Sequence, residues 1–223
     1  QPRPRMRKDS DHQVMSEALS DEMATLLIYD YRNRIIPFHT FADQLLRKIY
    51  RDNTHQGNNA VQTVMSMHMY PEYWMQQDII YVESKGGIRE RFNGRSHVSL
   101  IDLMDTLTGQ FIFTKEYEKA HQKRESERDE FDKKILKLVE RFALMQDVAI
   151  WRLMKIIPSK TDALKAWYVP LSQELAGVDT VGSNLALRFL PALDLASKSG
   201  SDKRANELLQ ELKDYQRAAA GDA

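Results

Sequence analysis

The stretch from residue 115 to residue 157 constrains the fold more than any other part of the sequence. Between Lys115 and Lys134, 14 of 20 residues are charged, and acidic and basic side chains alternate along the chain. Pairs four residues apart, such as Asp129 with Lys133, each stabilise a helix by roughly 0.2–0.5 kcal/mol. Apolar residues then follow at steps of four and three: Phe131, Ile135, Leu138, Phe142, Met145 and Ala149. The pattern predicts one long helix around 115–157, solvated in its first half and packed in its second.

The same stretch could instead pair with a partner as a coiled coil. A sustained coiled coil needs about three to four heptads of apolar residues, and the stretch holds fewer. We therefore favour packing within the chain. Pro158 is expected to end the helix, because proline cannot donate the next backbone hydrogen bond.

Polar and turn-forming residues divide the remaining chain into short segments. Thr40 is expected to cap a helix and Asn59 another, since both side chains can accept a bond from a free helix N–H. The expected helices lie within 11–24 and at 41–50, 60–68, 71–74, 184–197 and 202–219, with a short one beginning at Ser99. Hairpins are expected over 25–36 and across Gly86-Gly87, between 78–82 and 88–92. The fold class is mainly α with small β-hairpins, an irregular helical domain of the α+β type.

The chain is expected to form one domain with a short tail. Residues 1–10 carry Arg3, Arg5, Arg7 and Lys8 among two prolines, so we expect a disordered basic tail. A tether to anionic lipid is the alternative interpretation. Residues 11–223 are expected to form a single, mostly helical domain, with 183–219 as a helical subregion.

Composition and charge exclude several classes of protein. The 32 basic and 32 acidic side chains give a formal net charge of zero, which argues against a nucleic-acid partner, because such proteins need a basic excess. The chain has no cysteine, so disulfides, thiolate metal sites and cysteine nucleophiles are ruled out. No window of about 18 uninterrupted apolar residues occurs, as a membrane span would require.

Familiar catalytic and metal motifs are missing. The six histidines do not form a pair with metal-ligand spacing, and no nucleophile elbow or phosphate loop occurs. Asp102 and Asp105 could act as paired acids in an enzyme, yet without a partner base we expect solvated carboxylates. We predict no catalytic residue and no metal site.

His68 lies among Met65, Met67 and Met69. An imidazole with thioethers could ligate haem iron or copper. Methionines at helical spacing more often fill a core, so we favour a core role. The three tryptophans, Trp74, Trp151 and Trp167, are also expected to anchor the core.

Residues 32–40 gather unusual side chains at a hairpin-to-helix corner. Arg32, Arg34 and His39 could face an anionic ligand such as a haem propionate near a helix N-terminus. The alternative is structural: Pro37 fixes the turn, Phe38 packs into the core and Thr40 caps the helix. We favour the structural interpretation.

At this corner the sequence resembles a known family. Residues 34–40 read Arg-Ile-Ile-Pro-Phe-His-Thr, and 45–49 read Leu-Leu-Arg-Lys-Ile. This resembles the "GRIKPFHT…EVLRK" signature of the extracytoplasmic domain of ResB–CcsA-type, or system II, cytochrome c biogenesis proteins, especially the fused forms of Bacteroidetes. Further matches follow in order over about residues 12–170, at 71–74, 131–133, 139–141 (which ends in Arg141), 157–158 and 167–170 (which begins with Trp167). Asn33 and Ile36 depart from the signature, which has glycine and lysine there.

The resemblance implies a non-catalytic, periplasmic piece of a membrane-bound haem-attachment protein. It would position apocytochrome or haem, or brace the membrane domains of the same polypeptide. In that family haem is attached to the Cys-x-x-Cys-His segment of an apocytochrome, so haem would act through the full-length protein. The alternative is a stand-alone helical interaction module without a haem role.

Overall fold

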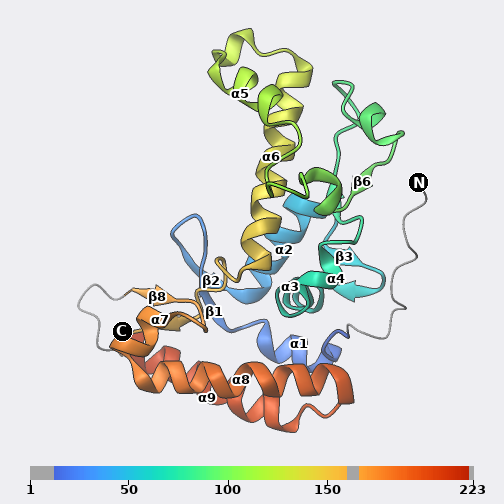
Figure 1. The fold of residues 1–223 in the computed structure, drawn as a ribbon. Coiled ribbons are helices and arrows are strands. Elements are labelled where there is room, and N and C mark those ends of the chain that lie inside the picture. Colours follow the sequence, from blue (N-terminus) through green and yellow to red (C-terminus); the bar gives the residue numbers. More distant parts are fainter. Residues whose placement is uncertain (1–12, 160–165, 221–223) are drawn as a thin grey trace.

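The computed structural model describes residues 13–159 and 166–220 (Figure 1). The predicted tail, residues 1–10, lies outside these residues. The helices are α1 (Glu17–Met23), α2 (Phe38–Tyr50), α3 (Ala60–Met69), α4 (Pro71–Trp74), α5 (Thr114–Gln122), α6 (Glu130–Ala149), α7 (Gln173–Val178), α8 (Thr180–Ser199) and α9 (Lys203–Ala220). Short 3₁₀ turns cover Arg89–Phe92, Ile101–Leu103 and Glu125–Glu127.

The described strands form four small antiparallel pairs, each between neighbours along the chain. These are β1 (Leu27–Tyr29) with β2 (Ile35–Pro37), β3 (Thr54–His55) with β4 (Asn58–Asn59), β5 (Ile80–Tyr81) with β6 (His97–Val98), and β7 (Ile157–Pro158) with β8 (Trp167–Tyr168). The mainly α fold with small hairpins is confirmed.

The expected long helix around 115–157 is wrong in its extent. The charged half folds as α5, turns through Glu125–Glu127, and packs back against α6. The reason is a capping box at Asp129 and Asp132, whose carboxylates accept from each other's backbone N–H at 2.8 and 3.1 Å. This box starts a new helix within the charged run. Lys123, at the end of α5, is paired with Asp132 at 2.6 Å.

The end of α6 also differs from the expectation. The helix stops at Ala149, and Trp151 adopts a left-handed backbone with φ of 63°, a conformation in which an α-helix cannot continue. Pro158, expected to end the helix, instead lies in β7 and pairs with Trp167.

Three smaller expectations are corrected as well. Thr40 lies inside α2, which begins at Phe38 and has no side-chain cap. The partner of β5 is residues 97–98, because positive φ at Gly86 and Gly87 leads into a 3₁₀ turn. Helix α8 begins at Thr180, with Asp179 as its N-cap. Asn59 does cap α3, as predicted, in a full capping box.

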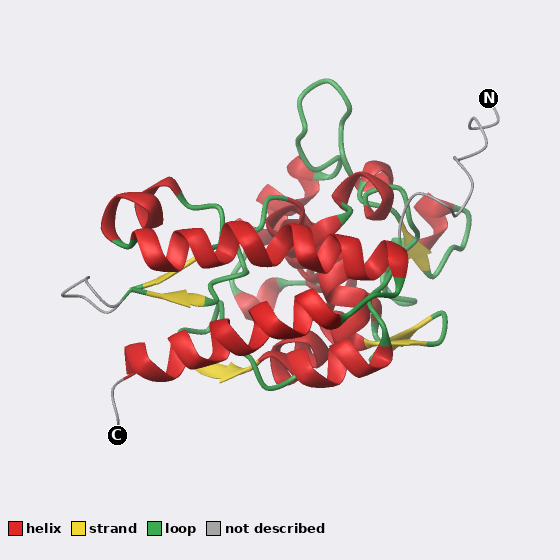
Figure 2. Cartoon of the chain, turned by 90° about the horizontal axis from the view of Figure 1, so that it is seen from below, coloured by secondary structure: helices red, strands yellow, loops and turns green. Residues whose placement is uncertain are grey.

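The core is built where α2, α3 and α6 contact each other. Phe41, Leu45, Val64 and Ile135 are fully buried or nearly so. A second layer, the antiparallel pair α8 and α9, packs along α1 and β7 (Figure 2). Among the described residues, no helix combines the length and apolar content that a bilayer crossing requires.

The last helix holds the first hairpin in place. The buried Gln216 amide of α9 accepts from the N–H of Leu27 at 2.9 Å and donates to the carbonyls of Leu27 and Ile156 at 2.8 and 2.7 Å. The Ser16 hydroxyl, at the start of α1, donates to Asp202 just before α9. Segments nearly 190 residues apart are thus joined by bonds between polar groups that packing has taken out of water.

Gly182 marks the tightest packing of α8. A Cβ added there would lie 2.8 Å from the Tyr215 hydroxyl and 2.9 Å from a methyl group of Ile157. We expect Gly182→Ala to lower the free energy of unfolding by about 1–3 kcal/mol, the usual cost of overpacking. Denaturant titration measures this. Gly177→Ala is the control, because its Cβ would meet nothing within 4 Å; equal losses in both variants would contradict the packing argument.

Candidate functional site

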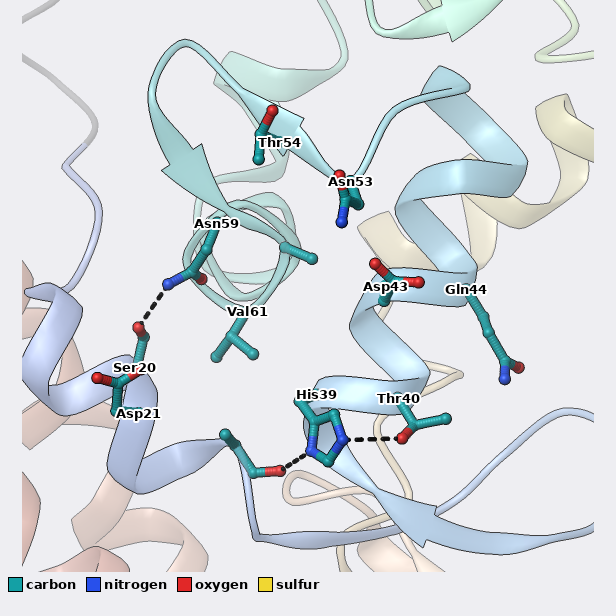
Figure 3. Close-up of a pocket in the computed structure, with 12 residues that line it drawn as sticks. Ser20, Asp21, His39, Thr40, Asp43, Gln44, Asn53, Thr54, Asn59 and Val61 are labelled. Carbon is teal, nitrogen blue, oxygen red and sulfur yellow. Dashed lines mark hydrogen bonds between the residues drawn. The ribbon is translucent and has the colours of Figure 1, made fainter.

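A pocket of about 420 Å³ opens beside the Arg34–Thr40 corner (Figure 3). Its walls come from the end of α1, the first turns of α2, the β3–β4 hairpin and the start of α3. Nine of its twelve lining residues have polar or charged side chains; the lining consists of Ser20, Asp21, Ala24, His39, Thr40, Asp43, Gln44, Asn53, Thr54, Asn59, Ala60 and Val61. We refer to it as the His39 pocket.

His39 is held in this wall by its neighbours. Its backbone N–H and its Nδ1 both lie 3.0 Å from the carbonyl oxygen of Ala24, and its Nε2 lies 3.1 Å from the Thr40 hydroxyl. We assign the tautomer with Nδ1 protonated, since a carbonyl can only accept. The Thr40 hydroxyl then donates to Nε2, so Thr40 positions His39 and does not cap α2. Both ring nitrogens are engaged within the protein, and nothing here favours iron ligation.

The pocket is lined by two carboxylates, and its lining includes no lysine or arginine. The two carboxylates are those of Asp21 and Asp43. Asp43 is paired with Arg47 at 2.9 Å, and both side chains of that pair are exposed. The lining therefore suits cationic groups and the peptide backbone better than an anion such as a haem propionate.

The structure does not bring Arg32 and Arg34 into the same pocket as His39. Arg34 forms two bonds to the buried Asp30 carboxylate, at 3.1 and 2.7 Å, and one to Gln44 at 3.1 Å. Asp30 also accepts from the backbone N–H of Arg32 and Arg34. Burial raises the pKa of Asp30, but the Arg34 side chain and these backbone bonds outweigh it and lower the pKa overall. Arg32 is exposed beside the ring of Tyr31.

The positions of Pro37 and Phe38 agree with the structural interpretation of this corner. Pro37 ends β2 and directly precedes α2, where a fixed φ and a missing N–H carry little cost. Phe38 is fully buried, with its ring 5.7 Å from that of Phe41.

His68 is completely buried in α3. Its Nδ1 donates to the carbonyl of Val64 at 2.7 Å, while Nε2 has no hydrogen-bond partner among the described residues. The ring meets that of Trp151 edge-on at 5.6 Å. Because burial disfavours the charged form, it lowers the pKa of His68 from 6.5 to about 4. These observations agree with a core role.

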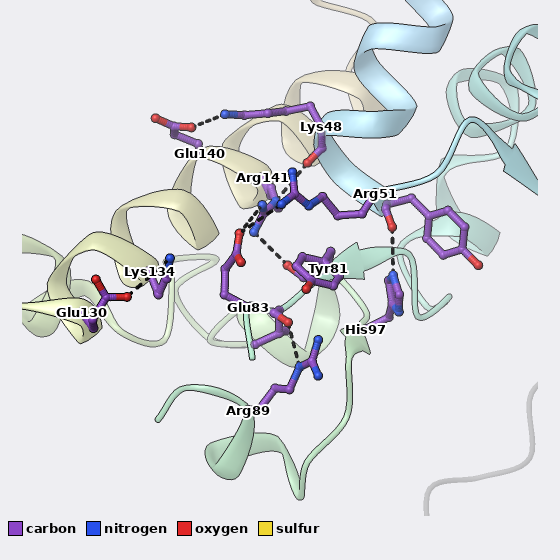
Figure 4. A network of polar contacts seen from close by, with 12 residues as sticks. Lys48, Arg51, Tyr81, Glu83, Arg89, His97, Glu130, Lys134, Glu140 and Arg141 are labelled. Carbon is purple, nitrogen blue, oxygen red and sulfur yellow. Dashed lines mark hydrogen bonds and ion pairs between the residues drawn. The ribbon is translucent and has the colours of Figure 1, made fainter. Parts of the chain in front are cut away.

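A feature that the sequence did not reveal is the buried guanidinium of Arg141 (Figure 4). It donates to the carbonyls of Lys48 and Tyr81, at 2.9 and 3.2 Å, and to the Glu83 carboxylate at 2.9 Å. The Arg141 side chain is only 3% exposed. Burial raises the pKa of Glu83, but the hydrogen bond and the charge of Arg141 outweigh burial. The pKa is therefore lowered overall and the carboxylate stays ionised. Arg141 therefore ties α6 to the end of α2 and to β5.

The other residues singled out from the sequence have local roles. Trp74 is buried and its Nε1 donates to Ser66 at 2.9 Å, as expected for a core anchor. Trp151 and Trp167 are half-buried. Asp102 binds Arg95 at 3.1 Å, and Asp105 accepts from backbone N–H groups of its own turn. Among residues 13–159 and 166–220, no three histidine or acidic side chains lie together in a way that could hold a metal.

No family model matches the chain. Over 166 residues the sequence is 27% identical to protein NrfI of Wolinella succinogenes. The chain resembles part of NrfI. The match covers 70% of this chain but only 17% of NrfI, so the chain corresponds to a small part of that protein.

The depressed pKa of His68 predicts a pH dependence of stability. An unfolded chain binds a proton at this imidazole below about pH 6.5, whereas the folded chain binds it only near pH 4. The stabilisation is thus complete above pH 6.5 and is lost as the pH falls toward 4, by about 3 kcal/mol. Denaturant titrations of wild type and His68→Leu at pH 7 and pH 4.5 measure the difference. Parallel losses in both proteins would contradict the assignment.

The Arg141 contacts predict a large effect of one substitution. Arg141→Met removes the donor of three hydrogen bonds, to the Glu83 carboxylate and to the carbonyls of Lys48 and Tyr81, so we expect a loss of about 3–5 kcal/mol in unfolding free energy. Arg188→Met breaks the exposed pair with Glu211 and should cost less than about 1 kcal/mol. If both variants lose the same amount, Arg141 is not the anchor described here.

Proposed function

We propose that this chain is the periplasmic, non-catalytic part of a membrane-bound cytochrome c biogenesis protein. In this role it positions the apocytochrome, the haem or both while membrane domains of the same polypeptide carry the attachment machinery. The similarity to NrfI and the ordered motifs of system II proteins support the proposal.

One observation carries the proposal furthest. The motifs that resemble the family are far apart in sequence, yet two of them are in direct contact. Arg141, from the match at 139–141, donates to the carbonyl of Lys48, from the match at 45–49. His39 and Thr40, from the match at 34–40, line the His39 pocket. The family-like residues therefore build one connected scaffold beside an open pocket.

The pocket lining favours a polypeptide client. Asp21 and Asp43 attract lysine and arginine side chains, and the lining amides of Gln44 and Asn53 can bond to a peptide backbone. A haem propionate would meet repulsion from the same two carboxylates. We assign the pocket to an extended segment of apocytochrome.

Peptide binding tests this assignment. A fluorescent apocytochrome peptide with a reduced Cys-x-x-Cys-His segment and flanking lysines should bind, with affinity that falls as salt rises. Replacing both acids, Asp21→Asn with Asp43→Asn, should weaken binding about tenfold, because each exposed charge contributes about 0.2–1 kcal/mol. Fluorescence anisotropy measures the dissociation constants.

The matched control is Glu174→Gln, which removes an exposed acid of α7 that does not line the pocket. It should leave binding unchanged. If the control weakens binding as much as the double variant does, attraction is general and the pocket is not the site. Absence of peptide binding to the wild-type chain would contradict the proposed positioning of apocytochrome.

The alternative function, a helical interaction module, is favoured by a different surface. Helix α8 exposes Val181, Leu187 and Leu195 by 64%, 53% and 58%. On the neighbouring α9, the exposed face carries ion pairs such as Arg204 with Glu207. Charged substitutions of the α8 residues that abolish function in cells while peptide binding is retained would favour this alternative.

A further inference from the structure

Helix α8 has an apolar face on the outside of the molecule. In Figure 1 the α8–α9 pair forms the lowest layer, and Figure 2 looks onto this layer from below. Val181, Leu187 and Leu195 of α8 are each more than half exposed. Pro191, between the two leucines, is exposed as well. At about 1.5 Å per residue the face from 181 to 195 is about 21 Å long, which indicates an interaction surface and not scattered exposure.

The spacing of this face is symmetrical about its middle. Leu187, Pro191 and Leu195 are four residues apart, so they form one continuous ridge along α8. Pro191 is the centre of the ridge, with a leucine at the same distance on either side. When a second copy packs in the reverse direction about a two-fold axis beside Pro191, Leu187 of each copy lies beside Leu195 of the other. Helices that pack through such ridges cross at about −50°, the commonest class in globular proteins.

The charges on the α9 side of the ridge fit the same arrangement. Arg188 is paired with Glu211 of α9 at 2.9 Å, and these side chains are 49% and 47% exposed. A two-fold axis perpendicular to α8 brings this side of one copy against the same side of the other. Arg188 of each copy can then reach Glu211 of the other, so the charges across the contact are complementary.

The charges also argue against a lipid surface or a strongly charged partner. On the other side of the ridge, Asp194 accepts from Lys198 at 2.8 Å and from Tyr70 at 2.6 Å. The ridge is thus flanked on both sides by an acid paired with a base. An anionic membrane surface is attracted by an excess of lysine and arginine, and an acidic or basic protein needs an excess of the opposite sign. A second copy needs neither.

We propose that this chain forms a symmetrical dimer through α8, with Leu187, Pro191 and Leu195 as the contact ridge. The partner is a second copy of the chain in the reverse direction, and each copy contributes the same residues. The ridge shares no residue with the His39 pocket, so dimer formation and peptide binding can be measured separately.

Sedimentation equilibrium of this chain over a range of concentrations tests the proposal. The wild type should form a reversible dimer. Leu187→Glu and Leu195→Lys should each raise its dissociation constant about tenfold or more, because the two-fold axis places a charge against a leucine twice in every dimer.

A mixture of the two variants tests the direction of packing. In an equimolar mixture the dimer should form again, since one glutamate then meets one lysine and the two remaining leucines meet each other. A parallel arrangement would not give this recovery, because it places each residue against its own equivalent. If the mixture stays dissociated, the antiparallel ridge is wrong.

The matched control is Leu107→Glu. Leu107 is 94% exposed on a loop outside α8, so the same change there should leave the dimer intact. Circular dichroism checks that all variants are folded, as expected for substitutions at positions that are more than half exposed. A wild-type chain that stays monomeric up to about 1 mM, where even weak specific contacts associate, would overturn the proposal. Equal weakening by Leu107→Glu would also overturn it.

Discussion

The arrangement of the helical core depends on one buried cation. Arg141 comes from the middle of α6 and reaches the C-terminal end of α2 and strand β5. A buried guanidinium is costly unless its donors are satisfied, and three of its bonds fix where these elements meet. Apolar packing alone would tolerate small shifts of one helix along another. The directional hydrogen bonds of the Arg141 guanidinium instead fix the position of α6 relative to α2 and β5.

The two ends of α2 have surroundings of different charge. At one end of α2, the hairpin and the first helical turn form a wall of the acidic His39 pocket. At the other end, Arg51 leaves the helix with a left-handed backbone, and its guanidinium lies over the ring of Tyr81. One 13-residue helix thus separates a surface suited to cationic peptide from a surface rich in guanidinium groups.

The sequence predicted local features better than contacts between distant segments. The hairpin at 25–36 and the Asn59 cap follow from neighbouring residues, and both are present. The break before α6 has a local signal, the Asp129 capping box, but this box lies within a run whose alternating charges also favour one continuous helix. By contrast, Arg141 and Glu83 are 58 residues apart, and no periodicity in the sequence pairs them. The sequence identifies His39 only as part of a motif. It does not predict the pocket beside His39, because the walls of that pocket also come from α1 and α3.

The bonds of Gln216 have a consequence for biosynthesis. A ribosome releases the first hairpin long before it has made α9, whose amide completes the backbone bonding of Leu27. During translation the early strands must remain incompletely paired for the time needed to add nearly 190 residues, about ten seconds or more at ordinary elongation rates. A chaperone that shields this early segment would therefore affect the yield of the protein more than one that acts on its final helices.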